Sequence, residues 1–237
     1  VGWEQLKTGP LSIPKVSING SLKDQKLTLD FDTFSEGEKL AHIRSEAEMR
    51  GDTIRYHVNP EGLVLNRNSW SIPASNQIIW SKKHVAITDF NLSLAQQKFI
   101  LSTSIPGVAK DHLAIVFENF NLATFTRFLN TEKVLANGAI NGQLVIENPF
   151  NELGLLADLT IKDLNVSEIP LGQLTIKMDA PTGKEYNLNL TLKGNNVDLG
   201  LKGSYVAAKG ESDLDFDFSL NHLDIKAFEG LLQNTIS

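Results

Sequence analysis

The sequence predicts an all-β fold. Apolar residues recur at every second position along most of the chain, which is the period of a β-strand with one buried face and one solvated face. Short turn signals, such as those at Asp24 and at Gly51-Asp52, separate the alternating segments. Stretches with helical periodicity are scarce, so we expect a meander of one-sided antiparallel strands.

The N-terminal part predicts two hairpins. Residues 16–31 form two alternating segments that meet near Asp24. Residues 43–58 form two more around Gly51-Asp52, with apolar residues on one side and arginine and glutamate on the other. Opposite charges on facing strands stabilise such a pair, so this second hairpin should have a charged outer face.

Residues 138–150, GAINGQLVIENPF, combine strand alternation with two glycines. Glycine inside a strand indicates a bend or a close approach of another backbone, and we interpret Gly138 and Gly142 in this way. A run of similar one-sided strands follows over residues 159–220.

The alternation changes phase between Ile161 and Leu164, and again between Leu220 and Leu223. A one-residue phase change without a turn predicts a β-bulge or a bend at each position.

Two segments 103 residues apart share a pattern. Residues 120–130 and 223–233 both place apolar residues at positions i, i+3, i+6 and i+7 after a strand. This spacing predicts a short amphipathic helical turn in each. We expect one elongated unit over residues 1–237, with 1–130 and 131–237 as candidate sub-units.

Composition narrows the function classes. The net charge of −6 argues against nucleic-acid binding, which depends on clustered lysine and arginine. The chain has no cysteine, which excludes thiol catalysis, cysteine-ligated zinc and disulfides.

No apolar run is long enough to span a membrane as a helix. Because Val1 is neither a methionine nor the start of a signal sequence, we expect a processed chain or an excised piece.

No motif predicts catalysis, a metal or a cofactor. The histidines are scattered without ligand spacing, and exposed strand or loop positions are expected for them. Asp213, Asp215 and Asp217 alternate with apolar residues, as on the solvated face of a strand, and lack the glycine and terminal glutamate of a calcium loop. Nucleophile-elbow and phosphate-loop motifs are absent. The prediction is a non-enzymatic protein.

The apolar faces of the strands need a cover. Burying four side chains per strand is worth about 6 to 12 kcal/mol, so several adjacent strands cannot leave this face in water. A second sheet would give a sandwich, and closure would give a barrel. A lipid acyl chain is the other cover, because it gains about 0.8 kcal/mol per buried CH₂, on the order of 10 kcal/mol in total. Periodicity leaves these alternatives open.

The order of several segments resembles the TamB family of Gram-negative bacteria, in its Bacteroidetes form. The segments are NSWSIPASNQIIW, ITDFNLSLAQQKFIL, LAIVFENFNLATFTRFLN, NGAINGQLVIENP, LLADLTIKDLNVSEIPLGQLTIK and LDFDFSLNHLDIKAFEGLL. The similarity covers most of the chain from about Leu63 onward. No single element is specific to the family, but their order is.

The resemblance implies an elongated, curved β-sheet that forms an open apolar groove, the β-taco. Members of this AsmA-like group are anchored in the inner membrane by an N-terminal helix and cross the periplasm. They are implicated in moving phospholipid between the inner and outer membranes, and in outer-membrane assembly with a TamA- or BamA-type barrel partner. The chain would then be an internal segment of a larger protein.

The resemblance also implies which residues line the groove and contact lipid. They are Ile140, Leu144, Ile146, Leu159, Ile161, Leu174, Ile176, Met178, Leu188, Leu190, Leu192, Leu199, Leu201, Leu214, Phe216 and Phe218. The helical turns at residues 125–129 and 228–232 would cap or plug this groove. The main hypothesis is a lipid conduit; the alternatives are a structural β-sandwich module that binds envelope proteins, and a hydrolase of envelope polymers.

Overall fold

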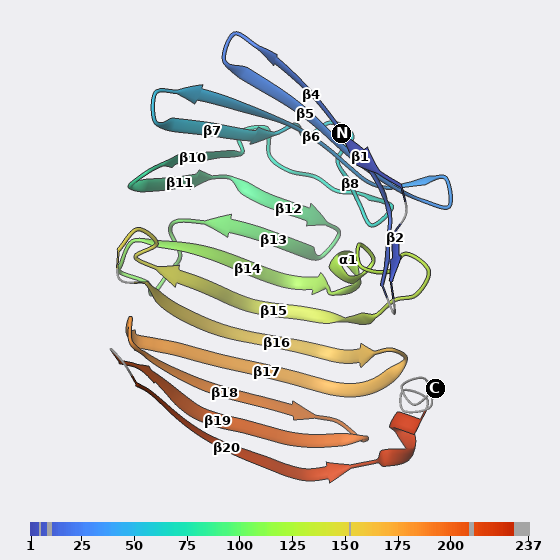
Figure 1. Cartoon of the computed structure of the whole chain (residues 1–237), viewed down its shortest axis with the longest axis vertical. Coiled ribbons are helices and arrows are strands. Elements are labelled where there is room, and N and C mark those ends of the chain that lie inside the picture. Colours follow the sequence, from blue (N-terminus) through green and yellow to red (C-terminus); the bar gives the residue numbers. More distant parts are fainter. Residues whose placement is uncertain (5, 9–10, 152, 209–210, 230–237) are drawn as a thin grey trace.

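The computed structural model describes residues 1–4, 6–8, 11–151, 153–208 and 211–229, without the side chains of residues 181 and 182. It confirms the all-β prediction. Two nine-stranded sheets, in which all strand pairs are antiparallel, hold most of these residues. Figure 1 shows their strands following one another along the long axis of the molecule, from the N-terminal hairpins to β20.

The first sheet contains both predicted N-terminal hairpins. Its strands, in spatial order, are β1 (Gly2–Trp3), β4 (Lys15–Lys23), β5 (Lys26–Ser35), β6 (Glu38–Arg50), β7 (Thr53–Val58), β10 (Gln77–Ser81) and β11 (His84–Thr88). Two short strands, β8 (Val64–Leu65) and β9 (Asn68–Ser69), are attached at β6. A separate small sheet pairs β2 (Leu6–Thr8) with β3 (Leu11–Ile13).

The second sheet is the predicted meander. Each strand pairs with the next one along the chain, in the order β12 (Phe90–Leu94), β13 (Gln97–Ser102), β14 (His112–Asn121), β15 (Ala136–Glu147), β16 (Gly154–Val166), β17 (Ile169–Thr182), β18 (Glu185–Lys193), β19 (Val197–Ala207) and β20 (Ser212–Leu223). The order begins at β12 and ends at β20, so the sheet does not close into a barrel.

The chain passes from the first sheet to the second between Thr88, the last residue of β11, and Phe90, the first residue of β12. Residue 130 lies within the span of the second sheet, in the connection between β14 and β15. There, Asn130 forms a parallel bridge with Ser12 of β3, which joins the N-terminal segment to the second sheet.

Both predicted bulges are present. The pairing of β16 with β17 shifts register between Ile161 and Leu164, and Asp163 in this gap has a φ of 51°. The pairing of β19 with β20 shifts between Asp198 and Leu199, where Leu220 and His222 are the facing residues. The phase changes in the sequence therefore mark local changes of strand pairing.

The two glycines of β15 also behave as expected. Gly142 has a φ of 114°, and a Cβ atom at this position would overlap the carbonyl oxygen of Asp158 on β16. Gly138 lies at a register shift between Asn137 and Ala139. A side chain at residue 142 is thus excluded by the close approach of the neighbouring strand.

Short helical turns follow β14 and β20. The α-helix α1 (Ala123–Thr126) continues as a turn to Leu129, and the 3₁₀-helix η1 (Ile225–Phe228) follows β20. Leu231 and Leu232, which belong to the second predicted turn, lie outside the described residues.

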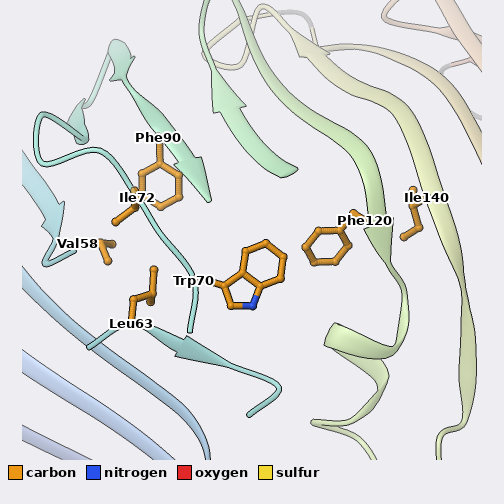
Figure 2. Close-up of a cluster of buried hydrophobic side chains, with 7 residues drawn as sticks. All are labelled: Val58, Leu63, Trp70, Ile72, Phe90, Phe120 and Ile140. Atoms are coloured by element: carbon orange, nitrogen blue, oxygen red, sulfur yellow. The ribbon is translucent and has the colours of Figure 1, made fainter. Parts of the chain in front are cut away.

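A core cluster of described residues lies where the two large sheets adjoin. Its fully buried members come from both sheets and from the connection between β7 and β10, as Figure 2 shows: Val58, Leu63, Trp70, Ile72, Phe90, Phe120 and Ile140. Residues of both sheets that are only partly buried, among them Tyr56, Ile78, Phe99 and Phe117, pack against this cluster. The apolar faces of the two sheets thus converge on one core.

Candidate functional site: the apolar face of the second sheet

Strand register places all of the predicted lining residues on one face of the second sheet. Residues directly opposite each other in an antiparallel pair point to the same side. The register continues from strand to strand through the pairs Ile140–Ile161, Leu159–Ile176, Ile176–Leu190, Leu190–Leu201 and Leu201–Phe218. The other predicted residues lie at alternate positions on these strands, so they share this face.

Burial divides the predicted residues into two groups. Ile140 is 6% exposed and belongs to the core cluster, while Leu159 and Ile161 pack against that cluster. The remaining predicted residues are half-buried or exposed, and none of them belongs to the core. Exposure is greatest on β20, where Leu214 is 67% and Phe218 is 64% exposed.

The face is larger than the resemblance implied. On β20 it continues through Leu220, which is 49% exposed and pairs with Leu199, and through Leu223, which pairs with Val197. On β12–β14 the same face carries Phe90, Leu92, Phe99, Leu101, Ile115 and Phe117. The same two-residue alternation marks these residues in the sequence, so periodicity alone was sufficient to find them.

Residues 59–76, here called the crossing segment, cover the central part of the apolar face. They connect β7 to β10 and place three side chains in the core: Leu63, Trp70 and Ile72, each 3 to 4% exposed. The Trp70 ring lies 5.6 Å from the ring of Phe120 on β14, and its Nε1–H donates a hydrogen bond to the Leu65 carbonyl, 3.1 Å away. The indole is therefore buried with its polar atom satisfied.

Hydrogen bonds attach the crossing segment to both large sheets. Asn76, which is 1% exposed, accepts from the Val58 amide at 2.9 Å and donates to the Val58 and Pro73 carbonyls at 2.8 and 2.7 Å. Ser71 and Ser93 of β12 exchange backbone hydrogen bonds, both 2.9 Å long. The segment is thereby attached to the first sheet and to the second.

Aromatic side chains extend this cover to α1. The ring of Phe125 on α1 lies 4.8 Å from that of Phe120, and 6.1 and 6.5 Å from those of Phe99 and Phe117. Packing of this kind supports the prediction that the first helical turn caps the apolar face.

The opposite faces of both sheets carry charged pairs, although Ala114 and Val145, which face each other on the opposite side of the second sheet, are fully buried. In the first sheet Arg44 donates hydrogen bonds to Asp30, with 2.7 Å between Nε and Oδ1. This hydrogen bond holds the pKa of the Asp30 carboxyl below its ordinary value and raises that of Arg44. Lys26–Glu46 and Lys98–Glu118 are further ion pairs across strands, so the predicted charged outer face is present.

The described residues contain no cluster of three or more histidine, cysteine, aspartate or glutamate side chains that could hold a metal. Asp213, Asp215 and Asp217 lie exposed on β20, at positions that alternate with the apolar ones.

One expectation about the histidines is wrong, because His112 is only 6% exposed. Its Nε2 accepts from the Ile105 amide, so its Nδ1 must carry the proton donated to the Lys110 carbonyl, 2.7 Å away. A neutral, fully hydrogen-bonded ring explains how a histidine is buried here.

No helix in the described part of the chain combines the length and apolarity needed to cross a membrane. No family model, curated protein or solved structure matches the chain. The function is therefore inferred from the geometry of the apolar face together with the sequence resemblance.

Proposed function

We propose that the uncovered part of the apolar face, on β17–β20, binds the acyl chains of phospholipids. The observation that carries this proposal is the exposure of large apolar side chains in register across adjacent strands. Leu214, Phe216, Phe218 and Leu220 of β20 are 39 to 67% exposed. A contiguous apolar surface of this kind marks an interaction site in a soluble domain.

The energetics favour an apolar ligand. Complete burial of one large apolar side chain contributes about 1.5 to 3 kcal/mol of free energy. The predicted lining residues on β17–β20 are only partly buried, so they contribute only part of this amount. An acyl chain contributes about 0.8 kcal/mol for each CH₂ that leaves water. Contact between these strands and one acyl chain therefore removes apolar area of both from water.

The uncovered face suits transport better than tight capture. Leu190, Leu201 and Phe218 illustrate its uniform lining of aliphatic and aromatic side chains from successive strands. Ligand sites that fix one orientation use a few convergent polar groups. On this face such groups lie only at one end among the described residues, where the Tyr205 hydroxyl donates to Ser212 and the Tyr186 hydroxyl donates to the Gly183 carbonyl. Many similar weak contacts allow a chain to slide, so we propose a non-enzymatic conduit in the form of an open groove.

The cellular setting is proposed from the resemblance to the TamB family. In this setting the chain is a periplasmic segment of a larger protein anchored in the inner membrane. It would take part in phospholipid transport between the inner and outer membranes and in outer-membrane assembly, with a TamA- or BamA-type barrel as partner.

A structural or scaffolding module is the second candidate, and the region around Trp70 favours it. There the apolar face is filled by the chain's own side chains, as in the core of a sandwich. On β17–β20, by contrast, the main packing within the described residues is with neighbouring strands of the same sheet. A scaffold would leave this part of the face to a protein partner instead of a lipid.

The test compares lipid content after purification from Gram-negative bacteria. The variant Phe218→Asp places a charge on the uncovered face, while Ser219→Asp places the same charge at the next residue, on the opposite face. Both positions are exposed on β20, so both variants should fold like the wild type. Phospholipid is measured by native mass spectrometry and by organic extraction.

We expect wild-type protein and Ser219→Asp to retain phospholipid, and Phe218→Asp to retain at least several-fold less. Absence of lipid from the wild type, or equal lipid in the two variants, would contradict the proposal and favour the scaffold.

A further inference from the structure

The apolar faces of the two sheets are interrupted at the core cluster. Beyond the cluster, the first sheet also exposes large apolar side chains: Leu22, Met49, Ile54 and Trp80 are 42 to 74% exposed. Register places Leu22 opposite Leu27 and Met49 opposite Ile54, on the same face as Tyr56, which packs against the cluster. Two uncovered apolar areas therefore flank one filled centre.

We propose that the crossing segment is the closed end of the acyl-chain site, and that Trp70 is the side chain that sets this end. Acyl chains on the second sheet stop at the row formed by Ile140 and Ile161, and do not continue onto the first sheet. This inference rests on the proposed function, but it concerns the boundary of the site and not its existence.

The first argument is that no space is left at the boundary. Val58 from the first sheet, Trp70 from the crossing segment and Phe120 from the second sheet are 1 to 4% exposed. Figure 2 shows them in sequence from one sheet to the other, with Trp70 between Leu63 and Phe120. An acyl chain can pass only by displacing a side chain that is already fully packed, which gains no apolar contact overall.

The second argument is that the crossing segment is held on both sides. Its strand β8 pairs with β6, its Asn76 side chain bonds to Val58, and Ser71 pairs with Ser93 of β12. Lifting Trp70 away from Phe120 would break buried hydrogen bonds as well as apolar packing. The crossing segment is therefore part of the folded core and not a loosely attached loop.

The third argument is one of length. From β16 to β20 the sheet has four strand spacings of about 4.8 Å, or about 19 Å in all. One acyl chain occupies half of the hydrocarbon thickness of a bilayer, which is about 15 Å. The second sheet thus accommodates the length of a phospholipid chain without using the first sheet.

The experiment maps bound chains by photo-crosslinking. Phosphatidylethanolamine with a diazirine in one acyl chain is loaded onto the protein, irradiated, and the labelled residues are identified by mass spectrometry. We expect labels on β17–β20 and on Leu159 or Ile161. Tyr56, Ile78 and Ile87 of the first sheet should carry at least ten-fold less.

Two variants test the role of Trp70. Trp70→Ala opens the boundary and should extend the labels to Val58 and Phe90. Trp80→Ala removes an indole that is 45% exposed, lies outside the core cluster and packs on Phe150, and it should leave the pattern unchanged. Trp70→Ala is also made together with Ser71→Cys and Ser93→Cys. The backbone pair at these residues has the geometry for a disulfide, and the chain has no other cysteine. The disulfide retains the segment if the single variant unfolds.

Wild-type labels of equal strength on both sheets would overturn the inference and leave the proposed function intact. Unchanged labelling in the disulfide-locked Trp70→Ala protein would overturn the role of Trp70. Absence of labels from every apolar residue would instead contradict the proposed function itself.

Discussion

The filled centre and the uncovered strands β17–β20 have the same sequence pattern but different environments. In both regions apolar residues alternate with polar ones, and the apolar ones lie on one continuous face. Around Phe120 this face is covered by the crossing segment and by α1. Around Phe218 the same kind of side chain is 64% exposed.

The difference teaches that alternation fixes which side chains share a face, but not what covers them. The energy of apolar burial is non-directional and depends on area, so a side chain of the same protein and a lipid chain are equivalent covers. In the described part of the chain, residues 59–76 and α1 supply this cover around Phe120.

The largest expected effect on stability comes from truncating Trp70, the side chain that covers the centre of the apolar face. Trp70→Ala should lower the free energy of unfolding by about 3 to 5 kcal/mol, because it leaves a cavity among fully buried neighbours. Phe218→Ala, also an aromatic truncation, should lower it by less than about 1 kcal/mol, because Phe218 is mostly in water. Urea unfolding followed by circular dichroism measures both. Equal losses would show that the two regions are equally covered and would break the comparison.

The next effect concerns β15, where the two regions join. Gly142→Ala should lower the free energy of unfolding by about 2 to 4 kcal/mol, because strain from the positive φ adds to overlap with the backbone of β16. Gly51→Ala is the control, since Gly51 also has a positive φ but has open space around it, and it should lose only about 1 kcal/mol. If the two variants lose the same amount, the close approach of β16 has no energetic weight.

A smaller effect is expected at the base of the crossing segment. Asn76→Ala leaves the buried amide and carbonyl of Val58 without these partners, which should lower the free energy of unfolding by about 1 to 3 kcal/mol. Hydrogen exchange should also become faster in residues 59–76, while β17–β20 stay unchanged. Ser75→Ala, at the exposed neighbouring residue, should change stability by less than about 0.5 kcal/mol. Equal acceleration of exchange in both regions would contradict local anchoring.

The smallest effect lies on the polar face. Arg44 depresses the pKa of Asp30, so the pair stabilises the folded state above the ordinary carboxyl pKa, and this contribution is lost as the pH falls through the lower folded-state pKa. In Arg44→Gln the pKa of Asp30 should rise toward its ordinary value when followed by NMR. Lys82→Gln, which breaks the exposed pair with Asp52, should not move it. Neither variant should change lipid binding, since both pairs lie outside the apolar face.

Much of the local structure could be predicted from the sequence. The alternation gave the strands of the meander, the phase changes gave the bulges near Asp163 and Leu220, and the glycines of β15 indicated a close backbone approach. These features depend on residues that are neighbours in the chain or on adjacent strands. The buried His112 was missed, because its hydrogen-bond partners at residues 105 and 110 come from an irregular connection.

The sequence by itself determined the one-sided strands, their order and the residues that share the apolar face, because a two-residue period and short turns leave few alternatives. Only the tertiary structure decided that Trp70 fills the centre of this face while, among the described residues, Leu214, Phe218 and Leu220 of β20 stay exposed. The reason is that residues 59–76 leave the first sheet and pack on the second. Local periodicity predicts strands and helices, but it does not predict against which surface a connection packs.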